Sequence, residues 1–248
     1  MKKIILIASV LMSSFALSSC SFNFYGVSSS SSECHSHAMI SDTINVDDFE
    51  TLSAYATTEV VYTQGYENKV IYEVCEEIID KIDIKVKNNS LNLGVYGENI
   101  NHKFKCTVIG KSPLNKVDVS GCSKMIYNGD LKCDDVDLEC SGASSIKVNG
   151  VVETKYLDVD LSGASHVTLN VVCEDLSVDV SGASNAVIKG TTRNADLDAS
   201  GASSVDADEM NVVNLSAEAS GASHILATAT GKTKISESGV SSVKVQNK

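Results

Sequence analysis

The chain has 248 residues and is acidic, with 32 Asp and Glu against 20 Lys and Arg and a formal net charge of −12. A nucleic-acid-binding surface requires concentrated Lys and Arg, so this composition excludes nucleic acid as a partner. One proline, no tryptophan and sixteen glycines suit a β-rich chain with tight turns.

Residues 1–19 have the features of an export signal. Two lysines precede the apolar stretch Ile4–Leu17, which is too short to span a bilayer comfortably. Leu17-Ser18-Ser19-Cys20 then resembles the bacterial lipoprotein signal, in which the cysteine becomes the lipidated first residue of the mature chain. The pattern predicts export, lipidation at Cys20 and, with Ser21 next, attachment to the outer membrane, on its periplasmic face or at the cell surface. An ordinary secretory cleavage site with an incidental cysteine is the alternative.

Residues 20–43 predict a flexible, serine-rich tether, because they include the run Ser28–Ser32 and show no apolar periodicity. Cys34-His35-Ser36-His37 offers three potential metal ligands in one tight run, which is a weak pattern, and we predict no metal site there. Seven cysteines remain besides Cys20, an odd number for an exported chain, and Cys75 and Cys106 are one possible disulfide pair.

Residues 44–110 are rich in strand-forming residues but lack the repeat that follows them. The end coil of a stacked β-structure exposes an unpaired edge that must be covered. We therefore predict that this region caps one end of the repeat region and continues its sheets. The expected elements are strands at 60–63, 70–74, 82–86, 91–95 and 103–108 and a helical turn at 75–81.

Residues 111–248 contain a four-residue phrase seven times, most often Ser-Gly-Ala-Ser, with leading serines 18 to 21 residues apart. A fixed period near twenty residues indicates stacked, nearly identical units. The second residue is always glycine, which suits a corner with positive φ, a conformation that only glycine adopts at little cost. The corner glycines are Gly121, Gly142, Gly163, Gly182, Gly201, Gly221 and Gly239.

Alternating apolar residues flank each copy, as in Leu157, Val159 and Leu161 before the phrase and Val167 and Leu169 after it. This alternation predicts a half-buried strand on each side of the corner. A unit of this size cannot bury its own apolar face, so the units should stack at the strand spacing of about 4.8 Å. The predicted fold class is all-β: a single-stranded β-helix, or β-solenoid, of about seven coils with a β-rich N-terminal cap.

The residue two positions before the leading serine is acidic in six consecutive coils, and stacking would place these carboxylates in a column about 5 Å apart. Like charges at that separation repel by about 1 kcal/mol per pair in water, so the column either has counter-ions or stays solvated. One interpretation is a face that binds calcium, or that bridges to anionic polysaccharide through calcium. The other is a solvated acidic face that keeps the sheet soluble, favoured because the chain lacks the glycine-rich repeat of calcium-binding β-rolls. The residues are Asp118, Glu139, Asp160, Asp179, Asp198 and Glu218.

Paired carboxylates also serve glycosidases, but equal carboxylates on every coil define no unique acid and base. His166 and His224 share one column but lie three coils apart, roughly 14 Å, too far to share an ion. No Ser-His-Asp arrangement, phosphate loop or nucleotide fingerprint is present in the sequence. We predict no catalytic residues, no metal site and no cofactor, with calcium the one ion that the acidic column would suit.

Several segments resemble one known family. These are Phe49–Leu52 leading to Val60–Gly65, Asp80–Ile82 with the later Ser90–Leu93, and the serial Ser-Gly-Ala-Ser units. They are similar to the auto-transporter adhesin "head GIN domain" proteins, common as lipoproteins in Bacteroides-like bacteria. The resemblance covers about residues 45–247 and implies a β-helical body in an exported, lipid-anchored setting. Ala-Ser follows the corner glycine where the family is named for Gly-Ile-Asn, so that motif does not transfer.

The expected function is that of a non-enzymatic, lipid-anchored envelope or surface protein whose acidic β-helix face acts as an adhesin-like binding module. Its partners would be the membrane, through the lipid anchor, and a polysaccharide, an envelope protein or a host protein. One alternative is a structural envelope component that self-associates, and another is a polysaccharide-active β-helix enzyme.

Overall fold

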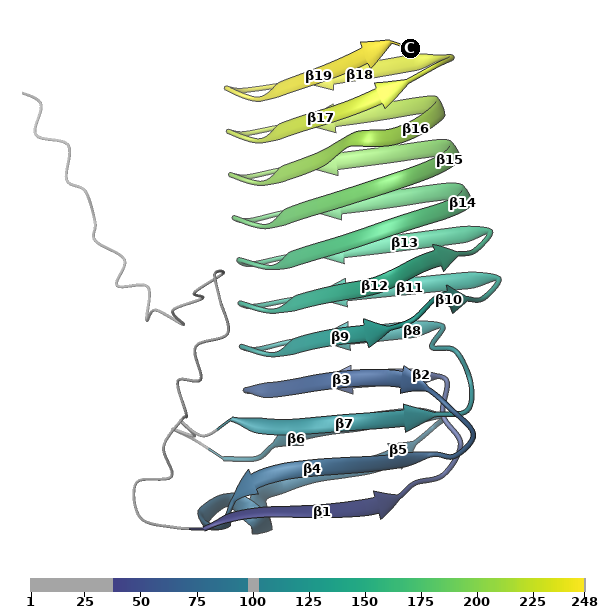
Figure 1. Ribbon diagram of the computed structural model, residues 1–248. Coiled ribbons are helices and arrows are strands. Elements are labelled where there is room, and N and C mark those ends of the chain that lie inside the picture. Colours follow the sequence, from purple (N-terminus) through teal and green to yellow (C-terminus); the bar gives the residue numbers. More distant parts are fainter. Residues whose placement is uncertain (1–37, 98–102, 248) are drawn as a thin grey trace, which may run out of the picture.

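The computed structural model describes residues 38–97 and 103–247 and shows a stack of β-coils (Figure 1). The predicted signal segment, the lipidation site Cys20 and the Cys34–His37 cluster lie outside the described residues. No helix within the described ranges is long and apolar enough to cross a membrane.

Each repeat coil contributes one strand to each of two sheets, and strands of successive coils pair in parallel within each sheet. The first sheet, called the acidic sheet below, holds the strands before the corners. These are β8 (Lys116–Val119), β11 (Asp135–Cys140), β13 (Tyr156–Leu161), the C-terminal halves of β14 (His166–Val180), β15 (Asn185–Ala199) and β16 (Ser204–Ala219), and β18 (Thr233–Glu237).

The second sheet, called the opposite sheet, holds the strands after the corners. These are β9 (Lys124–Asn128), β12 (Ser145–Glu153), the N-terminal halves of β14, β15 and β16, then β17 (His224–Ala229) and β19 (Ser242–Asn247), with the short β10 (Leu131–Lys132) beside β12. The prediction of an all-β solenoid of about seven coils is confirmed.

The core lies between the two sheets, where the inward side chains of successive coils fall in register. Val159, for example, is paired with Leu138 below and Val178 above, and all three are almost completely buried. Full burial of such a side chain contributes about 1.5–3 kcal/mol. The alternation seen in the sequence therefore stabilises the stack from one coil to the next, since no coil has a core of its own.

Glycine is required at each corner for two physical reasons. All seven have φ between 75° and 79°, in the left-handed region that favours glycine. The coils also approach closely there: the N–H of Ala164 donates to the carbonyl oxygen of Gly142 at 2.7 Å, and a Cβ on Gly163 would lie 2.5 Å from that oxygen. The backbone ladder thus continues around the corner only where no side chain intervenes.

The last serine of each of the first six phrases is buried at the corner, as are Ser165, Ser203 and Ser223. The Ser203 hydroxyl donates to the carbonyl oxygen of Val180 at 2.9 Å, and the Ser223 hydroxyl donates to that of Ala199 at 2.9 Å. These hydroxyls bond carbonyl oxygens of the preceding coil inside the protein, which offsets the cost of burying polar groups at the corner.

The N-terminal region continues both sheets, as predicted. β2 (Thr51–Ala54) pairs in parallel with β8 and β6 (Ser90–Val95), and β3 (Thr58–Gln64) pairs in parallel with β9 and β7 (Phe104–Gly110). Ala56 has φ 66° and accepts a hydrogen bond from Cys122, so it occupies the position of the corner glycine in a coil that lacks the repeat phrase.

Antiparallel strands close this end of the stack. β4 (Lys69–Cys75) pairs with β7 and with β1 (Met39–Asn45), and β5 (Ile82–Lys87) pairs with β6. The predicted helical turn is a 3₁₀ helix, η1 (Glu76–Lys81). Because β1 starts at Met39, the prediction of a tether over residues 20–43 is wrong for 39–43. This edge strand is almost wholly exposed and therefore lacks the apolar alternation that identifies the other strands.

The proposed pairing of Cys75 with Cys106 is also wrong, because Cys106 has a free thiol. Burial raises the pKa of that thiol well above its ordinary value. Cys106 packs in the core as a small apolar side chain.

Candidate functional site

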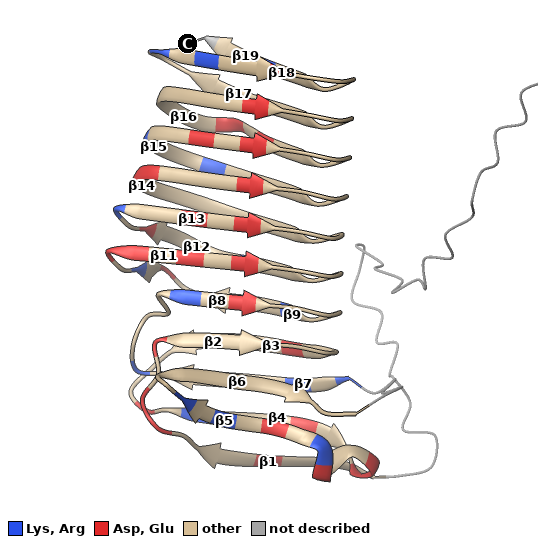
Figure 2. Cartoon of the chain, turned by 180° about the vertical axis from the view of Figure 1, so that it is seen from behind, with Lys and Arg blue, Asp and Glu red and all other residues tan. Residues whose placement is uncertain are grey.

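The six acidic residues singled out in the sequence lie in one register column on the outer surface of the acidic sheet. Glu139 pairs with Asp118 on one side and Asp160 on the other, and the pairing continues through Asp179 and Asp198 to Glu218. Figure 2 shows this column as red segments near the arrowheads from β8 up through β16. These six residues are called the acidic column below.

Two further outward columns run beside the acidic column. The nearer one alternates carboxylates with hydroxyls in its middle part: Asp137, Asp158, Ser177, Asp196 and Ser216, with Lys116 and Lys234 at its ends. The farther one consists of Asp135, Tyr156, Asp175, Asn194, Asn214 and Lys232.

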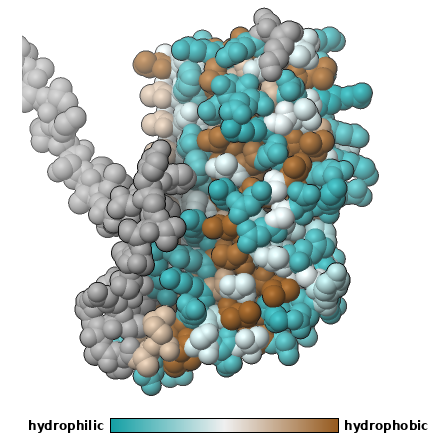
Figure 3. All heavy atoms as spheres, viewed as in Figure 1, coloured by the Kyte–Doolittle hydropathy of each residue, from teal (hydrophilic) through white to brown (hydrophobic). Residues whose placement is uncertain are grey.

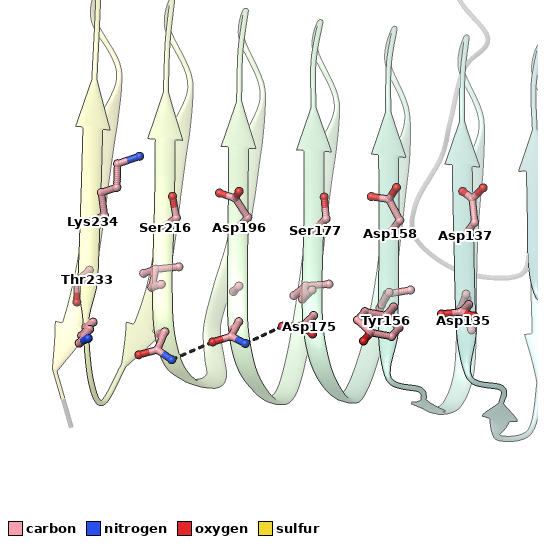
Figure 4. Close-up of a pocket in the computed structure, with 18 of the residues that line it drawn as sticks. Asp135, Asp137, Tyr156, Asp158, Asp175, Ser177, Asp196, Ser216, Thr233 and Lys234 are labelled. Atoms are coloured by element: carbon pink, nitrogen blue, oxygen red, sulfur yellow. Dashed lines mark hydrogen bonds between the residues drawn. The ribbon is translucent and has the colours of Figure 1, made fainter.

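A shallow groove of about 1260 Å³ lies over these two columns and extends from Lys116 to Lys234. Figure 4 shows the part between Asp137 and Lys234. Within it, Asn214 donates to Asn194 at 2.9 Å, and Asn194 donates to Asp175 at 2.6 Å. Tyr156 stands in the same row with 54 % of its surface exposed. The groove thus offers carboxylates, amides and one aromatic ring along the axis of the stack.

Smaller hollows lie between the acidic column and the leading serines of the corners. One of about 400 Å³ is lined by Asp118, Glu139 and Asp160 together with Ser141 and Ser162. Another of about 260 Å³ continues past Asp179, Asp198 and Glu218. Carboxylates and serine hydroxyls therefore line the same hollows along most of the acidic sheet.

Basic partners are concentrated at the two ends of this face. Lys116 Nζ lies 2.6 Å from Asp137 Oδ2 and 2.5 Å from Glu139 Oε1, and Lys234 Nζ lies 3.6 Å from Glu218 Oε1. Among the described residues, the carboxylates of the middle coils have no such ion pair; these are Asp158, Asp160, Asp179, Asp196 and Asp198. The centre of the face therefore carries uncompensated negative charge.

The environment of the acidic column opposes ionisation. Partial burial, followed by the neighbouring carboxylates, raises the pKa of Asp160, Asp179 and Asp198 above the ordinary aspartate value. The pKa of Asp118 is raised by the same causes, although Lys116 counteracts them. Asp198 Oδ1 is also buried and has no hydrogen-bond partner among the residues that the structure describes. The carboxylates of the acidic column therefore take up protons more readily than ordinary aspartates, and their hydrogen-bonding capacity is not fully used.

The carboxylates that the structure describes do not converge on a common point. No group of three or more His, Cys, Asp or Glu side chains in the described part of the chain is arranged to hold a metal ion. The carboxylates stand one per coil along a straight column, whereas calcium takes six to eight oxygen ligands converging on one point. The described carboxylates of the acidic column therefore do not form the converging set of ligands that calcium binding requires.

His166 and His224 lie three coils apart, as the spacing predicts, because Asn185 and Ser204 occupy the column between them. The His166 ring is half-buried and lies 3.1 Å from the Asn185 side-chain nitrogen. Burial lowers its pKa below the ordinary histidine value, which keeps the ring neutral near pH 7.

A second polar cluster, at the capped end, gave no signal in the sequence. Tyr55 and Tyr96 both donate to Asp83 Oδ2, at 2.7 and 2.6 Å, and Lys85 Nζ lies 3.0 Å from Asp83 Oδ1. Burial alone would raise the pKa of Asp83, but the three hydrogen bonds outweigh it and hold that pKa below its usual value. The ring of Tyr55 lies over Gly94, where a Cβ would collide with it. The cluster joins the coil of β2 and β3, through Tyr55, to the capping strands β5 and β6.

The comparisons with known proteins agree with this architecture. A model of the family described as "Putative auto-transporter adhesin, head GIN domain" matches residues 48–146 and residues 136–248. The family resemblance noted in the sequence is confirmed by these matches. A comparison with curated proteins finds no match.

Three solved structures with the same fold come from Parabacteroides species. A "putative adhesin" from Parabacteroides distasonis has a TM-score of 0.73 at 19% identity, covering 86% of this chain and 98% of its own. A "putative adhesin" from Parabacteroides merdae has a TM-score of 0.68 at 19% identity, covering 84% and 92%. A "putative lipid binding protein" from P. distasonis has a TM-score of 0.73 at 15% identity, covering 84% and 96%. At these identities the likeness establishes the fold alone.

Proposed function

Because the chain belongs to the head GIN domain family of auto-transporter adhesins, we propose that it is a non-enzymatic binding module of the cell envelope. The family and two of the three similar structures are described as "putative" adhesins, and the third as a "putative lipid binding protein"; none of these descriptions names an enzyme. The proposed ligand is an extended polysaccharide that lies along the groove of the acidic sheet and crosses successive coils. Its attachment to the outer membrane through a lipid on Cys20 is part of the same proposal, supported by the signal pattern at residues 1–20.

One observation carries the proposal: the groove presents polar side chains on every coil, and its central carboxylates have no basic partner among the described residues. Sugar hydroxyls are hydrogen-bond donors that carboxylates and amide oxygens accept, and an exposed aromatic ring such as Tyr156 can stack on a sugar ring. Coils repeat at about 4.8 Å, close to the length of one sugar unit, so consecutive sugar units would meet polar side chains of consecutive coils.

Repetition also argues against catalysis in this groove. A glycosidase needs one carboxyl group held protonated and another held ionised around one bond. In the acidic column beside the groove, the pKa values of Asp160, Asp179 and Asp198 are all raised, and by the same causes, so no carboxyl group of that column is set apart as the acid or the base. Equivalent groups suit a repetitive ligand, which gains affinity from many weak, identical contacts.

The binding experiment uses the purified chain and immobilised neutral, amine-bearing and anionic polysaccharides, read by biolayer interferometry. We expect binding to neutral or amine-bearing polymers, falling about tenfold or more in Tyr156→Ala and in Asp158→Ala with Asp196→Ala. Lys147→Ala, on the opposite sheet, is the matched control and should bind as the wild type does. Failure to bind any of the polymers, or equal loss in the control, would contradict the proposal.

The anchor is tested separately. Cells expressing the full-length chain are fed an alkyne-tagged fatty acid, and incorporation is compared with that in Cys20→Ser. We expect labelling of the wild type alone and recovery of the wild type in the outer-membrane fraction. Equal labelling of both chains would remove Cys20 as the anchor but leave the groove proposal standing.

A further inference from the structure

The last coil of the solenoid leaves two strand edges unpaired. Among the described residues, β18 pairs only with β16 and β19 pairs only with β17. At the other end, antiparallel β1, β4 and β5 close the stack (Figure 1). Unpaired N–H and C=O groups on such edges are a template for pairing with another chain.

The core is also open at this end. Ile235 is 48% exposed, whereas Ala217, its partner one coil below, is fully buried. Val243 and Val245 pack on the core but are only partly buried. Another coil laid on this surface would remove these apolar groups from water, at about 25 cal/mol per Å².

The residues of β18 are arranged so that this strand can pair with β18 of a second copy of the chain. A twofold axis through Ile235 would set β18 antiparallel to its copy and place Ile235 against Ile235. The same axis would place Lys234 against Ser236 and Thr233 against Glu237. No like charges would then lie directly opposite each other, an arrangement that cross-strand pairing requires.

The same axis serves β19. Glu237 contacts Val243 across the coil, so Val245 lies opposite Ile235, two residues farther along each strand. Val245 would then meet its own copy, and Lys244 would meet Gln246. Both edges could pair at once, and both sheets would continue from one molecule into the other.

One residue conflicts with this pairing. Glu237 lies in register with Ala219, in an inward column that holds Ala199 and Val180 in the coils below. It is the charged member of a column that is otherwise apolar from Val119 to Ala219. Glu237 Oε1 accepts a hydrogen bond from the N–H of Val243 at 2.5 Å, which holds the carboxylate over the end of the core.

We propose that the C-terminal coil is an interface matched to a second copy of this chain, and that Glu237 keeps it closed. In the monomer the Glu237 carboxylate remains solvated. A second copy would enclose it between two apolar coils, and burying a charge without a basic partner is strongly unfavourable. An inward-pointing charge on an edge strand prevents edge-to-edge association in this way.

The test is sedimentation velocity on the full chain at concentrations up to about 100 μM. The wild type is expected to be monomeric. Glu237→Val, which restores the apolar column, is expected to double the sedimenting mass and stop there, because each molecule has one such C-terminal coil and head-to-head pairing uses both. Glu174→Val removes the same charge from an exposed position elsewhere and should remain monomeric.

A second substitution tests whether the two copies pair at Ile235. Glu237→Val combined with Ile235→Lys should return to the monomer, because it places like charges opposite each other at the twofold axis. A monomeric Glu237→Val would overturn the proposal, as would a wild type that dimerises equally. Assemblies of Glu237→Val larger than two would overturn the head-to-head pairing. If Glu237→Val does not fold, Glu237→Gln replaces it, with weaker but concentration-dependent dimerisation as the expected result.

Discussion

At the scale of single residues, the corner explains why one glycine recurs in every coil. The left-handed φ alone would permit other residues at a cost, as Ala56 shows by occupying the equivalent position with φ 66°. What excludes a side chain in the stacked coils is the carbonyl oxygen of the glycine below. For Gly163 that oxygen would lie 2.5 Å from an added Cβ.

Gly163→Ala should therefore lower the free energy of unfolding by about 2–4 kcal/mol, the sum of backbone strain and steric overlap. The matched control is Gly129→Ala: Gly129 has φ 100°, but an added Cβ would meet nothing within 4 Å. The control should lose only the strain, about 1–2 kcal/mol. Urea denaturation measures both, and equal losses would show that the close approach of the coils contributes nothing.

At the scale of elements, the acidic sheet joins a stabilising backbone ladder to a destabilising column of like charges. Lys116 and Lys234 relieve the repulsion at its two ends, and the middle coils bear it. The raised pKa values of Asp160 and Asp179 mean that the folded state binds protons more readily than the unfolded chain.

Stability from these groups should consequently rise as the pH falls from 7 through their folded pKa values toward the ordinary aspartate value of 3.8. Asp160→Asn with Asp179→Asn should flatten that rise and stabilise the protein at pH 7 by up to about 1 kcal/mol. Urea unfolding of both proteins at pH 7 and pH 5 measures the difference. A variant as pH-dependent as the wild type would show that the column does not carry the repulsion. The lowered pKa of Asp83 makes its contribution to stability fall, not rise, as the pH falls. This contribution is the same in the wild type and in the double variant, so it cancels when the two are compared.

At the scale of the whole molecule, the solenoid is a series of similar units that contact only their neighbours. Ser162 and Ser181 start two phrases 19 residues apart, and the strands around them pair in parallel with equivalent neighbours. Removal of residues 162–180 would join Leu161 to Ser181 and preserve every inward column.

This deletion should leave a cooperatively folded β-protein whose urea m-value is about a tenth smaller, because about a tenth of the buried surface is lost. Removal of residues 162–171, half a coil, should prevent folding, since it would turn the following strand into the wrong sheet. Circular dichroism with urea titration distinguishes the two. If the full-coil deletion also failed to fold, the coils would not be interchangeable units.

Most of the repeat region could be predicted from the sequence, because its physics is local and periodic. Alternation in Leu157–Leu161 and Val167–Leu169 identifies two strands, and Gly163 between them identifies the corner. Once the period was read, the register of Asp118 with Glu139 and Asp160 followed from it. The coil at Thr51–Gln64 could not be predicted in this way, because Ala56 and Thr58 stand where the repeat phrase would be. The strands β4 to β7 also separate this coil in sequence from the coil of β8 and β9, with which it pairs.

The sequence by itself determined the coils, the corners and the outward columns of charge, since a period of twenty residues leaves one way to stack them. Only the tertiary structure decided how the stack ends. The Tyr55–Asp83–Tyr96 cluster and the antiparallel cap join segments that share no period. Pairing of this kind depends on which chain segments meet in space, and no local pattern encodes that.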